Sequence, residues 1–386
     1  MRKLIPFLGL LFIVILACNS SDQTNQDTAA TFSIEIADSL QIDYLGDFWI
    51  MDYDPQSEQF VSLTKNDQEV LVIDQKGKIK SSFVIPSEGP GAISGIFLVS
   101  MNNGKVEVFD SRNGFFVLSQ KGEILKLTRI PYQYIYINQG SSDAYFSLGK
   151  GIAYMRPEYY DSLGHFGGFK GMVKEIYRKP LMEILDTINN QTKPIMTIPK
   201  ESIYADGNYY FIPFTSVTNF NEMWYLNFTK ELRFFVYEMK NQDLTLGKSV
   251  NLQVKDAVLP LGISFDQAEN YMELSKGTMP GTILQLYRMD ELVIVIYQKG
   301  VSQELIFTNN LLPEPQDLNS INKTYAAVFD TNHELIQNDI LVPSGLIFSR
   351  AITKDGEILA KKNQDYFETE EDQVIYYKLK LVELND

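Results

Sequence analysis

Short hydrophobic runs separated by turn residues recur along most of the chain. Between Gly95 and Ile130, runs rich in β-branched and aromatic residues alternate with turn signals built from Gly, Asn, Asp and Lys. Such runs are typical of β-strands, and the Asn-Gly and Lys-Gly pairs supply the positive φ angles that tight hairpins need. The segment therefore predicts four antiparallel strands, which together form one blade of a β-propeller. We expect these strands at Gly95–Val99, Val106–Phe109, Phe115–Leu118 and Glu123–Ile130.

The same pattern occurs immediately before this segment. Residues 75–79 read Gln-Lys-Gly-Lys-Ile, and residues 120–124 repeat them as Gln-Lys-Gly-Glu-Ile at an offset of 45 positions. A repeat of that length lies within the range of propeller blades. The sequence thus predicts a preceding blade with strands at Phe48–Tyr53, Gln59–Leu63, Val70–Asp74 and Ile79–Ile85.

Four looser units follow these two blades. Residues 345–384 offer only three convincing strands, whereas Phe32–Ile36 is a strand without a unit. Pairing this isolated strand into the last unit would complete four strands and close the ring, which removes the exposed edges of an open array. The other three units are expected at 144–203, 209–254 and 283–342.

These units predict an all-β fold, a six-bladed β-propeller closed by its N-terminal strand. The predicted domain is a single one over residues 32–386, with insertions near 161–171 and 255–282, the second of which contains the one clear helix candidate at Phe265–Ser275. Single cores rarely grow beyond ~250–300 residues, so a chain of this length needs either repeats or two domains. A pair of β-sandwich domains is the competing interpretation.

The N-terminus has the features of a secretory signal. Two basic residues precede the apolar run Leu4–Ala17, which is shorter than the ~20 residues that a membrane-spanning helix needs. The sequence Ile15–Cys18 resembles the lipobox of bacterial lipoproteins, which implies that Cys18 becomes the lipidated N-terminus. We therefore expect a signal peptide at residues 1–17 and a flexible tether at 18–31. An ordinary cleaved signal with a chance cysteine is the alternative.

Composition narrows the compartment and the partners. Cys18 is the only cysteine, so the fold has no disulfide although an exported protein meets an oxidising environment. The net charge of −15 argues against nucleic acid and against electrostatic docking on an anionic membrane. We expect a lipid-anchored protein of a Gram-negative cell envelope, with the outer membrane as the favoured location. The sequence does not decide whether the protein faces the periplasm or the outside of the cell.

Catalytic and metal-binding patterns are weak. The only two histidines, His165 and His333, have no histidine or cysteine nearby, so the sequence predicts no metal site, no cofactor and no catalytic residue. His333 is expected in a turn, and His165 in a glycine-dense insertion loop. Three carboxylates within Asp52–Glu58 resemble a calcium loop, but the spacing of an EF-hand is absent. A solvated hairpin turn is favoured there.

One loop is a candidate for contact with a ligand. Glu88, Gly89, Pro90 and Gly91 lie between the first and second blades, where a crossover reaches the mouth of the channel. A simple crossover between blades is favoured over ligand contact. Aromatic residues make up 12% of the chain and could stack on sugars, although packing between the sheets is the favoured explanation.

The lipobox, the loop Ser87–Gly91 and the aspartates that end strands ahead of turns together carry a resemblance. These aspartates are Asp74, Asp110 and Asp330. On these features the chain resembles the six-bladed β-propeller lipoproteins common in Bacteroidota, with NHL-like and TolB-like relatives. The resemblance implies a binding or scaffolding module, and it carries over no catalytic residue because none is established in that family.

Three functions are compatible with these features. The first is a non-catalytic module that binds a protein or glycan partner on one face of the ring. The alternative is a hydrolase or lyase that acts on polysaccharide with acidic residues at the channel, since architecture alone does not decide function. The third is a structural subunit of an envelope complex that docks through the insertion at 255–282.

Overall fold

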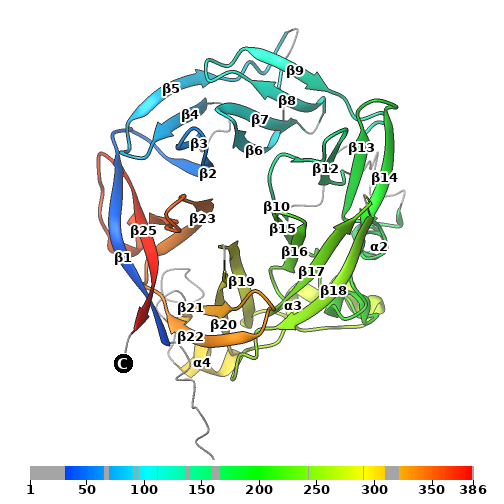
Figure 1. The fold of residues 1–386 in the computed structure, drawn as a ribbon. Helices are drawn as coiled ribbons and strands as arrows, with labels where there is room; N and C mark the ends of the chain where they lie inside the picture. The colour runs from blue at the N-terminus through cyan, green and yellow to red at the C-terminus, as the bar shows by residue number, and fades with distance from the viewer. Residues whose placement is uncertain are drawn as a thin grey trace, which may run out of the picture.

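The computed structural model describes residues 31–64, 69–89, 92–93, 95–110, 112–134, 140–157, 166–241, 243–289, 291–308 and 321–384. Within these residues the strands form six sheets around one central axis, so the fold is a six-bladed β-propeller (Figure 1). The predicted fold class is confirmed, and the alternative of two β-sandwiches is wrong. The predicted signal peptide, Cys18 and the tether up to residue 30 lie outside the described residues.

The first two blades match the prediction strand by strand. Each is a sheet of four antiparallel strands whose first strand lies next to the axis and whose fourth lies at the rim (Figure 1). The bounds are β2 (Phe48–Asp54), β3 (Gln59–Thr64), β4 (Glu69–Asp74) and β5 (Ile79–Val84) in the first blade, and β6 (Ile96–Asn102), β7 (Lys105–Asp110), β8 (Gly114–Leu118) and β9 (Ile124–Thr128) in the second.

The repeated Gln-Lys-Gly segment forms the same turn in both blades. Gly77 and Gly122 each have a φ of 83°. The N–H of Gly77 donates to the carbonyl of Asp74, and that of Gly122 to the carbonyl of Ser119, both at 3.0 Å. Glycine adopts this left-handed conformation without strain, so the repeat in sequence reflects a repeat in backbone geometry.

The third and fourth blades contain one strand that the sequence did not predict. A two-residue strand, β10 (Gly140–Ser141), follows the second blade in sequence. It pairs in parallel with β15, the first strand of the fourth blade. The remaining bounds are β11 (Phe146–Ser147), β12 (Gly151–Met155), β13 (Met182–Asp186) and β14 (Gln191–Met196) in the third blade, and β15 (Thr215–Phe220), β16 (Met223–Phe228), β17 (Arg233–Lys240) and β18 (Asp243–Asn251) in the fourth.

The sixth sheet contains strands from both ends of the described chain. The fifth blade consists of β19 (Met279–Arg288), β20 (Val293–Val301), β21 (Thr324–Phe329) and β22 (Leu335–Leu341), and the sixth of β23 (Leu346–Ile352), β24 (Ile358–Lys362), β25 (Val374–Leu384) and β1 (Thr31–Ile42). β1 is the outer strand and pairs antiparallel with β25, from Thr31 opposite Leu384 to Ile42 opposite Val374.

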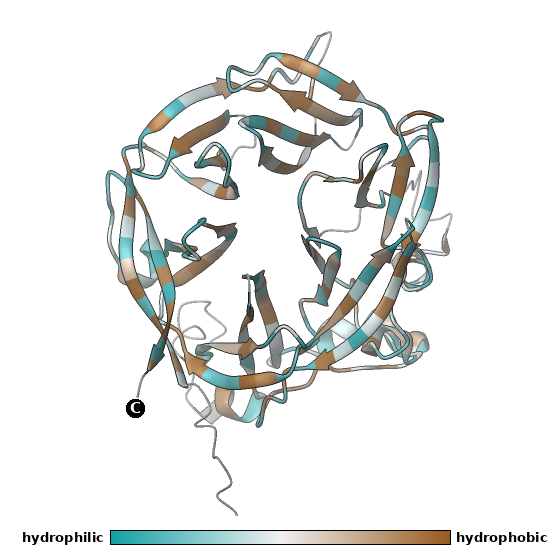
Figure 2. Ribbon diagram, viewed as in Figure 1, coloured by the Kyte–Doolittle hydropathy of each residue, from teal (hydrophilic) through white to brown (hydrophobic). Residues whose placement is uncertain are grey.

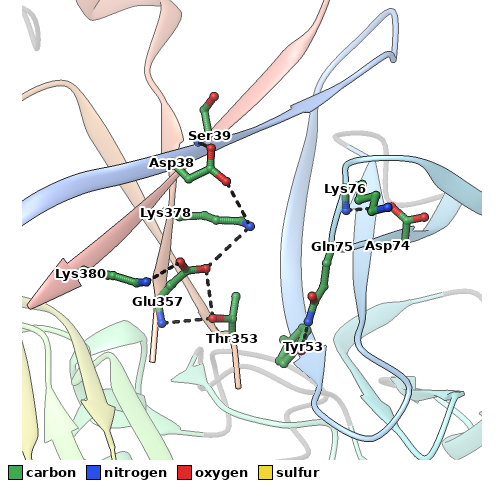
Figure 3. A network of polar contacts seen from close by, with 10 residues as sticks. All are labelled: Asp38, Ser39, Tyr53, Asp74, Gln75, Lys76, Thr353, Glu357, Lys378 and Lys380. Atoms are coloured by element: carbon green, nitrogen blue, oxygen red, sulfur yellow. Dashed lines mark hydrogen bonds and ion pairs between the residues drawn. The ribbon is translucent and has the colours of Figure 1, made fainter. Parts of the chain in front are cut away.

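Ion pairs link these strands at the rim. The carboxylate of Glu357 lies 3.2 Å from Lys380 and 3.7 Å from Lys378 (Figure 3). Lys378 also lies 3.6 Å from the carboxylate of Asp38 on β1. One lysine therefore connects β1 and Glu357 at the seam next to the first blade.

Burial follows the position of a strand within its blade. Middle strands such as β4 are buried along nearly their whole length, whereas outer strands such as β5 alternate between partly buried and exposed residues. Figure 2 shows the same contrast, with continuous hydrophobic colour on the middle strands and alternating colour on the rim. This is the pattern of sheets packed face to face around a ring, with only the outermost strands facing solvent.

The described helices lie in connections between strands. Their bounds are α2 (Phe169–Ile176), η2 (Ile203–Ala205), η3 (Phe265–Asn270), α3 (Tyr271–Leu274), α4 (Gln303–Thr308) and α6 (Gln364–Phe367). The predicted helix at Phe265–Ser275 is present as η3 followed by α3. The expectation of a loop throughout 161–171 is wrong from Phe169 onward, because α2 begins there and buries Met172, Val173 and Ile176.

The two ends of each sheet differ in the connections they carry. At one end, which we call the turn end, the strands are joined by tight turns, such as those between β2 and β3 or between β4 and β5. At the other, the loop end, run the connections between second and third strands and the crossovers to the next blade. Each described helix lies at the loop end. None of the described helices is long and apolar enough to span a membrane.

Candidate functional site

Two cavities meet at the loop end of the sixth blade. One, of about 570 Å³, is lined by the starts of β2 and β25, and the other, of about 380 Å³, by the starts of β21 and β23. Ile347 and Asn363 line both, so we treat the two cavities as one depression and call it the loop-face groove. Each volume lies within the range of small-molecule sites, about 300–1,000 Å³.

The helix α6 and its cap form one wall of the groove. The side-chain oxygen of Asn363 accepts hydrogen bonds from the N–H groups of Asp365 and Tyr366, at 3.2 and 3.4 Å. The N–H of Asn363 donates to the carbonyl of Gly345 at 2.9 Å. Gly345 has a φ of 74°, and a Cβ at this position would overlap the rings of Tyr366 and Phe367. Glycine therefore lets the two aromatic rings pack directly on the crossover.

Trp49 and Lys361 line the larger of the two cavities. The Nζ atom of Lys361 lies 4.3 Å from the centre of the Trp49 ring, and the same ammonium pairs with Asp47 and donates to the carbonyl of Phe48 at 3.3 Å. A cation over an indole face is attracted by the ring quadrupole. Trp49 is nevertheless 39% exposed, so part of the indole remains open to the groove.

Glu371 contributes an oxygen without a partner among the described residues. Its Oε1 atom pairs with the ammonium of Lys362, which also lies 5.1 Å from the centre of the Phe367 ring. Its Oε2 atom is buried and has no hydrogen-bond partner within the described part of the chain. A buried acceptor of this kind normally receives a hydrogen bond from water or a ligand.

A third cavity, of about 220 Å³, lies in the central channel beside the groove. It shares Trp49 with the larger groove cavity and Ile347 with both. Its lining comes from the inner strands β2, β19 and β23, including Gln285 and Arg350, and from Tyr376 of β25. The pairing register of all three strands shifts near their middle, and such bulges re-aim side chains.

An ion pair links this cavity to the opposite side of the ring, because Arg350 lines the cavity. Arg350 of β23, in the sixth blade, pairs with Asp143, which precedes β11 in the third. The sixth and third blades are opposite one another in a ring of six. The side chain of Arg350 is 15% exposed and that of Asp143 is 40% exposed, so the pair is only partly shielded from solvent.

Two further carboxyl groups surround the pair. Burial and the Asp143 carboxylate raise the pKa of Asp52, which also accepts a hydrogen bond from the N–H of Met101 at 2.8 Å. Burial raises the pKa of Glu107 to about 7. The hydroxyl of Tyr145 donates a hydrogen bond of 2.8 Å to this carboxylate, which acts to lower the same pKa. Carboxyl groups with raised pKa values are candidates for acid–base chemistry, although structural networks produce the same shifts.

The predicted ligand loop lies at the loop end, in the crossover between β5 and β6. Glu88 and Gly89 are exposed, and Gly89 has a φ of 91° with open space around it. Pro90 and Gly91 lie outside the described residues, as does His165. The position as a crossover is confirmed, whereas contact with a ligand stays a prediction.

The carboxylates of the segment Asp52–Glu58 and the ring of His333 make contacts with other side chains and with backbone groups. Asp52 accepts a hydrogen bond from the N–H of Met101, whereas Asp54 accepts hydrogen bonds from Ser57 and from the N–H of Gly104. The carboxylates therefore diverge, which contradicts a shared calcium site. His333 lies in a tight turn, as predicted, with its ring buried 3.2 Å from the hydroxyl of Tyr225. Among the described residues no group of three His, Cys, Asp or Glu side chains is placed to hold a metal ion.

The insertion at 255–282 packs on α2 and exposes other apolar groups. Tyr271 and Ile263 are buried in a cluster with Val173 of α2. Four large apolar side chains of the insertion are exposed instead: Leu259, Leu261, Met272 and Leu274. This surface lies at the loop end, apart from the residues that line the groove.

Sequence reasoning missed the groove. Its walls come from positions near 49, 347 and 365, which no local motif connects. The one signal available was the pair Tyr366–Phe367, because two adjacent aromatic residues stand within the otherwise polar segment 363–373.

Comparisons with known proteins address the fold. No protein-family model and no curated protein matches the sequence. A DUF4221 family member from Bacteroides vulgatus matches 92% of this chain and 99% of its own, with a TM-score of 0.61 and 12% identity. An exported protein from Bacteroides fragilis matches 94% of this chain and 98% of its own, with a TM-score of 0.57 and 12% identity. The chain shares their propeller fold. The predicted resemblance to Bacteroidota propellers is thus confirmed at the level of fold.

Proposed function

We propose that this protein is a lipid-anchored, non-catalytic binding module of the cell envelope that holds a protein or glycan partner at its loop end. The observation that carries this proposal is the difference between the two ends of the sheets. The described helices, the groove and the four exposed apolar side chains of the 255–282 insertion lie at the loop end. Loops on a rigid scaffold are the usual place for recognition.

The anchor is proposed from the lipobox at Cys18 and supported by the likeness to an exported protein. Thr31, the first described residue, pairs with Leu384 at the turn end of the sixth sheet. The groove lies at the opposite end of the same sheet, beyond Val374. A tether attached at Thr31 therefore leaves the groove open to a partner.

Two experiments test the proposal. Metabolic labelling with a palmitate analogue is expected to label the full chain and not its Cys18→Ser variant, and an unlabelled wild type would contradict the anchor. For binding, the chain without residues 1–18 keeps every described residue. It is expected to bind on a glycan array or to capture an envelope protein without chemical turnover. The absence of binding in both the glycan array and the capture assay would contradict a binding module.

The alternative is a hydrolase or lyase acting on polysaccharide. One observation favours it: Asp52 has a raised pKa beside the Asp143 carboxylate, and pairs of carboxyl groups held in different protonation states perform acid–base chemistry in glycosidases. The ion pair of Asp143 with Arg350 occupies one of these groups. Release of reducing or unsaturated ends from a polysaccharide, abolished by Asp52→Asn, would establish this alternative.

A further inference from the structure

We infer that the loop-face groove binds a neutral oligosaccharide. This inference rests on the proposed function as a binding module and adds the site and the class of ligand. Two aromatic side chains are placed to stack on such a ligand. Trp49 lines one of the two cavities of the groove and Tyr366 lines the other, and they are 39% and 37% exposed. Rigid amphipathic rings of this kind offer large contact area at low conformational cost.

The lining of the groove has hydrogen-bonding groups of the kind that sugars require. The lining contains four side-chain amides that already make hydrogen bonds within the protein: Gln298, Asn322, Asn363 and Gln364. Each amide has two N–H donors and an oxygen with two lone pairs, so these groups keep further capacity for a ligand. The buried Oε2 atom of Glu371 adds an acceptor without a partner among the described residues. Sugar hydroxyls, which donate and accept in turn, match such a lining better than an apolar ligand does, because an apolar ligand would leave the Oε2 atom of Glu371 without a hydrogen bond.

The charges of the lining favour a neutral ligand. Four carboxylates and three lysines line the two cavities, so the lining has little net charge. Two of the lysines, Lys361 and Lys362, are already paired with Asp47 and Glu371. An anionic ligand would have to break these pairs and approach a chain of net charge −15. Neutral sugars are therefore favoured over sulfated or uronic acid chains.

Both aromatic platforms are held rigidly. Asn363 caps α6, and Gly345 seats the ring of Tyr366 against the crossover. Lys361 holds one side of the Trp49 indole. Because both platforms are fixed by contacts within the protein, little side-chain entropy is lost on binding.

Tryptophan fluorescence provides the test. The chain has two tryptophans, and the second, Trp224, is 1% exposed in the core. Acrylamide quenching therefore reports mainly Trp49. The chain without residues 1–18 is titrated with neutral gluco-, xylo-, manno- and chito-oligosaccharides, with oligogalacturonate and with tri-lysine. A neutral oligosaccharide is expected to protect Trp49, and Trp49→Phe is expected to abolish the change.

Variants at Tyr366 localise the binding, measured by calorimetry with the oligosaccharide that protects Trp49. Tyr366→Ala is expected to weaken binding roughly tenfold through loss of stacking, whereas Tyr366→Phe keeps the ring and stays within about twofold. Phe169→Ala is the matched control, because Phe169 is equally exposed at 37% and lies on α2, outside the groove. It is expected to bind like the wild type.

The outcomes separate this inference from the proposed function. Protection of Trp49 by tri-lysine or oligogalacturonate but by no neutral sugar overturns the inference. Glycan or protein binding that survives both Trp49→Phe and Tyr366→Ala also overturns it, while the binding module stands. If no partner of any kind is found, both fail.

Discussion

The turn end and the loop end of the same sheets differ in how their residues are used. At the turn end, aspartates and glycines satisfy the backbone locally: Asp74 accepts from the N–H groups of Lys76 and Lys78, at 2.9 and 3.0 Å. Asp186 and Asp330 do the same in later blades. At the loop end, cavities and exposed aromatic rings remain. The tight turns of this ring therefore serve stability, whereas its long connections provide contact surface.

Two glycines with similar φ angles provide the sharpest test of this difference. Gly77, at the turn end, has a φ of 83°, and a Cβ there would overlap the carbonyl oxygen of Gln41 on β1. Gly89, at the loop end, has a φ of 91° and open space. We expect Gly77→Ala to lower the free energy of unfolding by about 3 kcal/mol and Gly89→Ala by about 1 kcal/mol. Urea denaturation measures both, and equal losses would remove the distinction.

The channel between the two ends predicts a pH effect. The pKa of Glu107 is raised to about 7, above its unfolded value, so the stability it contributes is complete below about pH 4.5 and is lost as pH rises through 7. Glu107→Gln cannot ionise. It is expected to be more stable than the wild type by roughly 2 kcal/mol at pH 8 and not at pH 4, measured by urea denaturation at both pH values. The exposed Glu88→Gln is the control, and a gain independent of pH would contradict the mechanism.

Removing an aspartate from a tight turn is expected to change the free energy of unfolding by less than the substitutions above. Asp74→Ala removes the acceptor for two N–H groups and is expected to cost about 1 kcal/mol of unfolding free energy. Glu88→Ala, on an exposed crossover, is expected to change it by less than about 0.5 kcal/mol. Thermal unfolding of the two variants compares the ends directly. The distinction fails if the Glu88 variant loses as much as the Asp74 variant.

The exposed apolar surface predicts the smallest change in stability. Met272 is 68% exposed on α3, so Met272→Ser is expected to alter the unfolding free energy by less than about 0.5 kcal/mol. The same substitution is expected to reduce capture of any protein partner that docks on the 255–282 insertion. A loss of stability above about 1 kcal/mol would show that Met272 supports the fold instead.

The regular blades could be predicted from sequence because their signals are local. The Gln-Lys-Gly repeat encodes the turns at Gly77 and Gly122 directly, and the strands of the first two blades follow from their alternation. Boundaries in the third to fifth blades were looser because insertions such as 156–181 interrupt the spacing. The strand β10 could not be predicted, since two residues carry no periodic signal.

The candidate sites were harder to predict than the blades. Arg350 and Asp143 meet only because the ring places the third and sixth blades face to face, and the register shift near Arg350 is not visible in the sequence. The groove likewise depends on residues brought together from both ends of the chain. Long-range geometry of this kind has no counterpart in local composition.

The ion pair between Arg350 and Asp143 is a direct connection across the ring. It joins the sixth blade to the segment before the third blade, which lies on the opposite side of the ring. A displacement of β23, which carries both Arg350 and the groove residue Ile347, is therefore resisted at the far side of the circle as well as by the adjacent sheets.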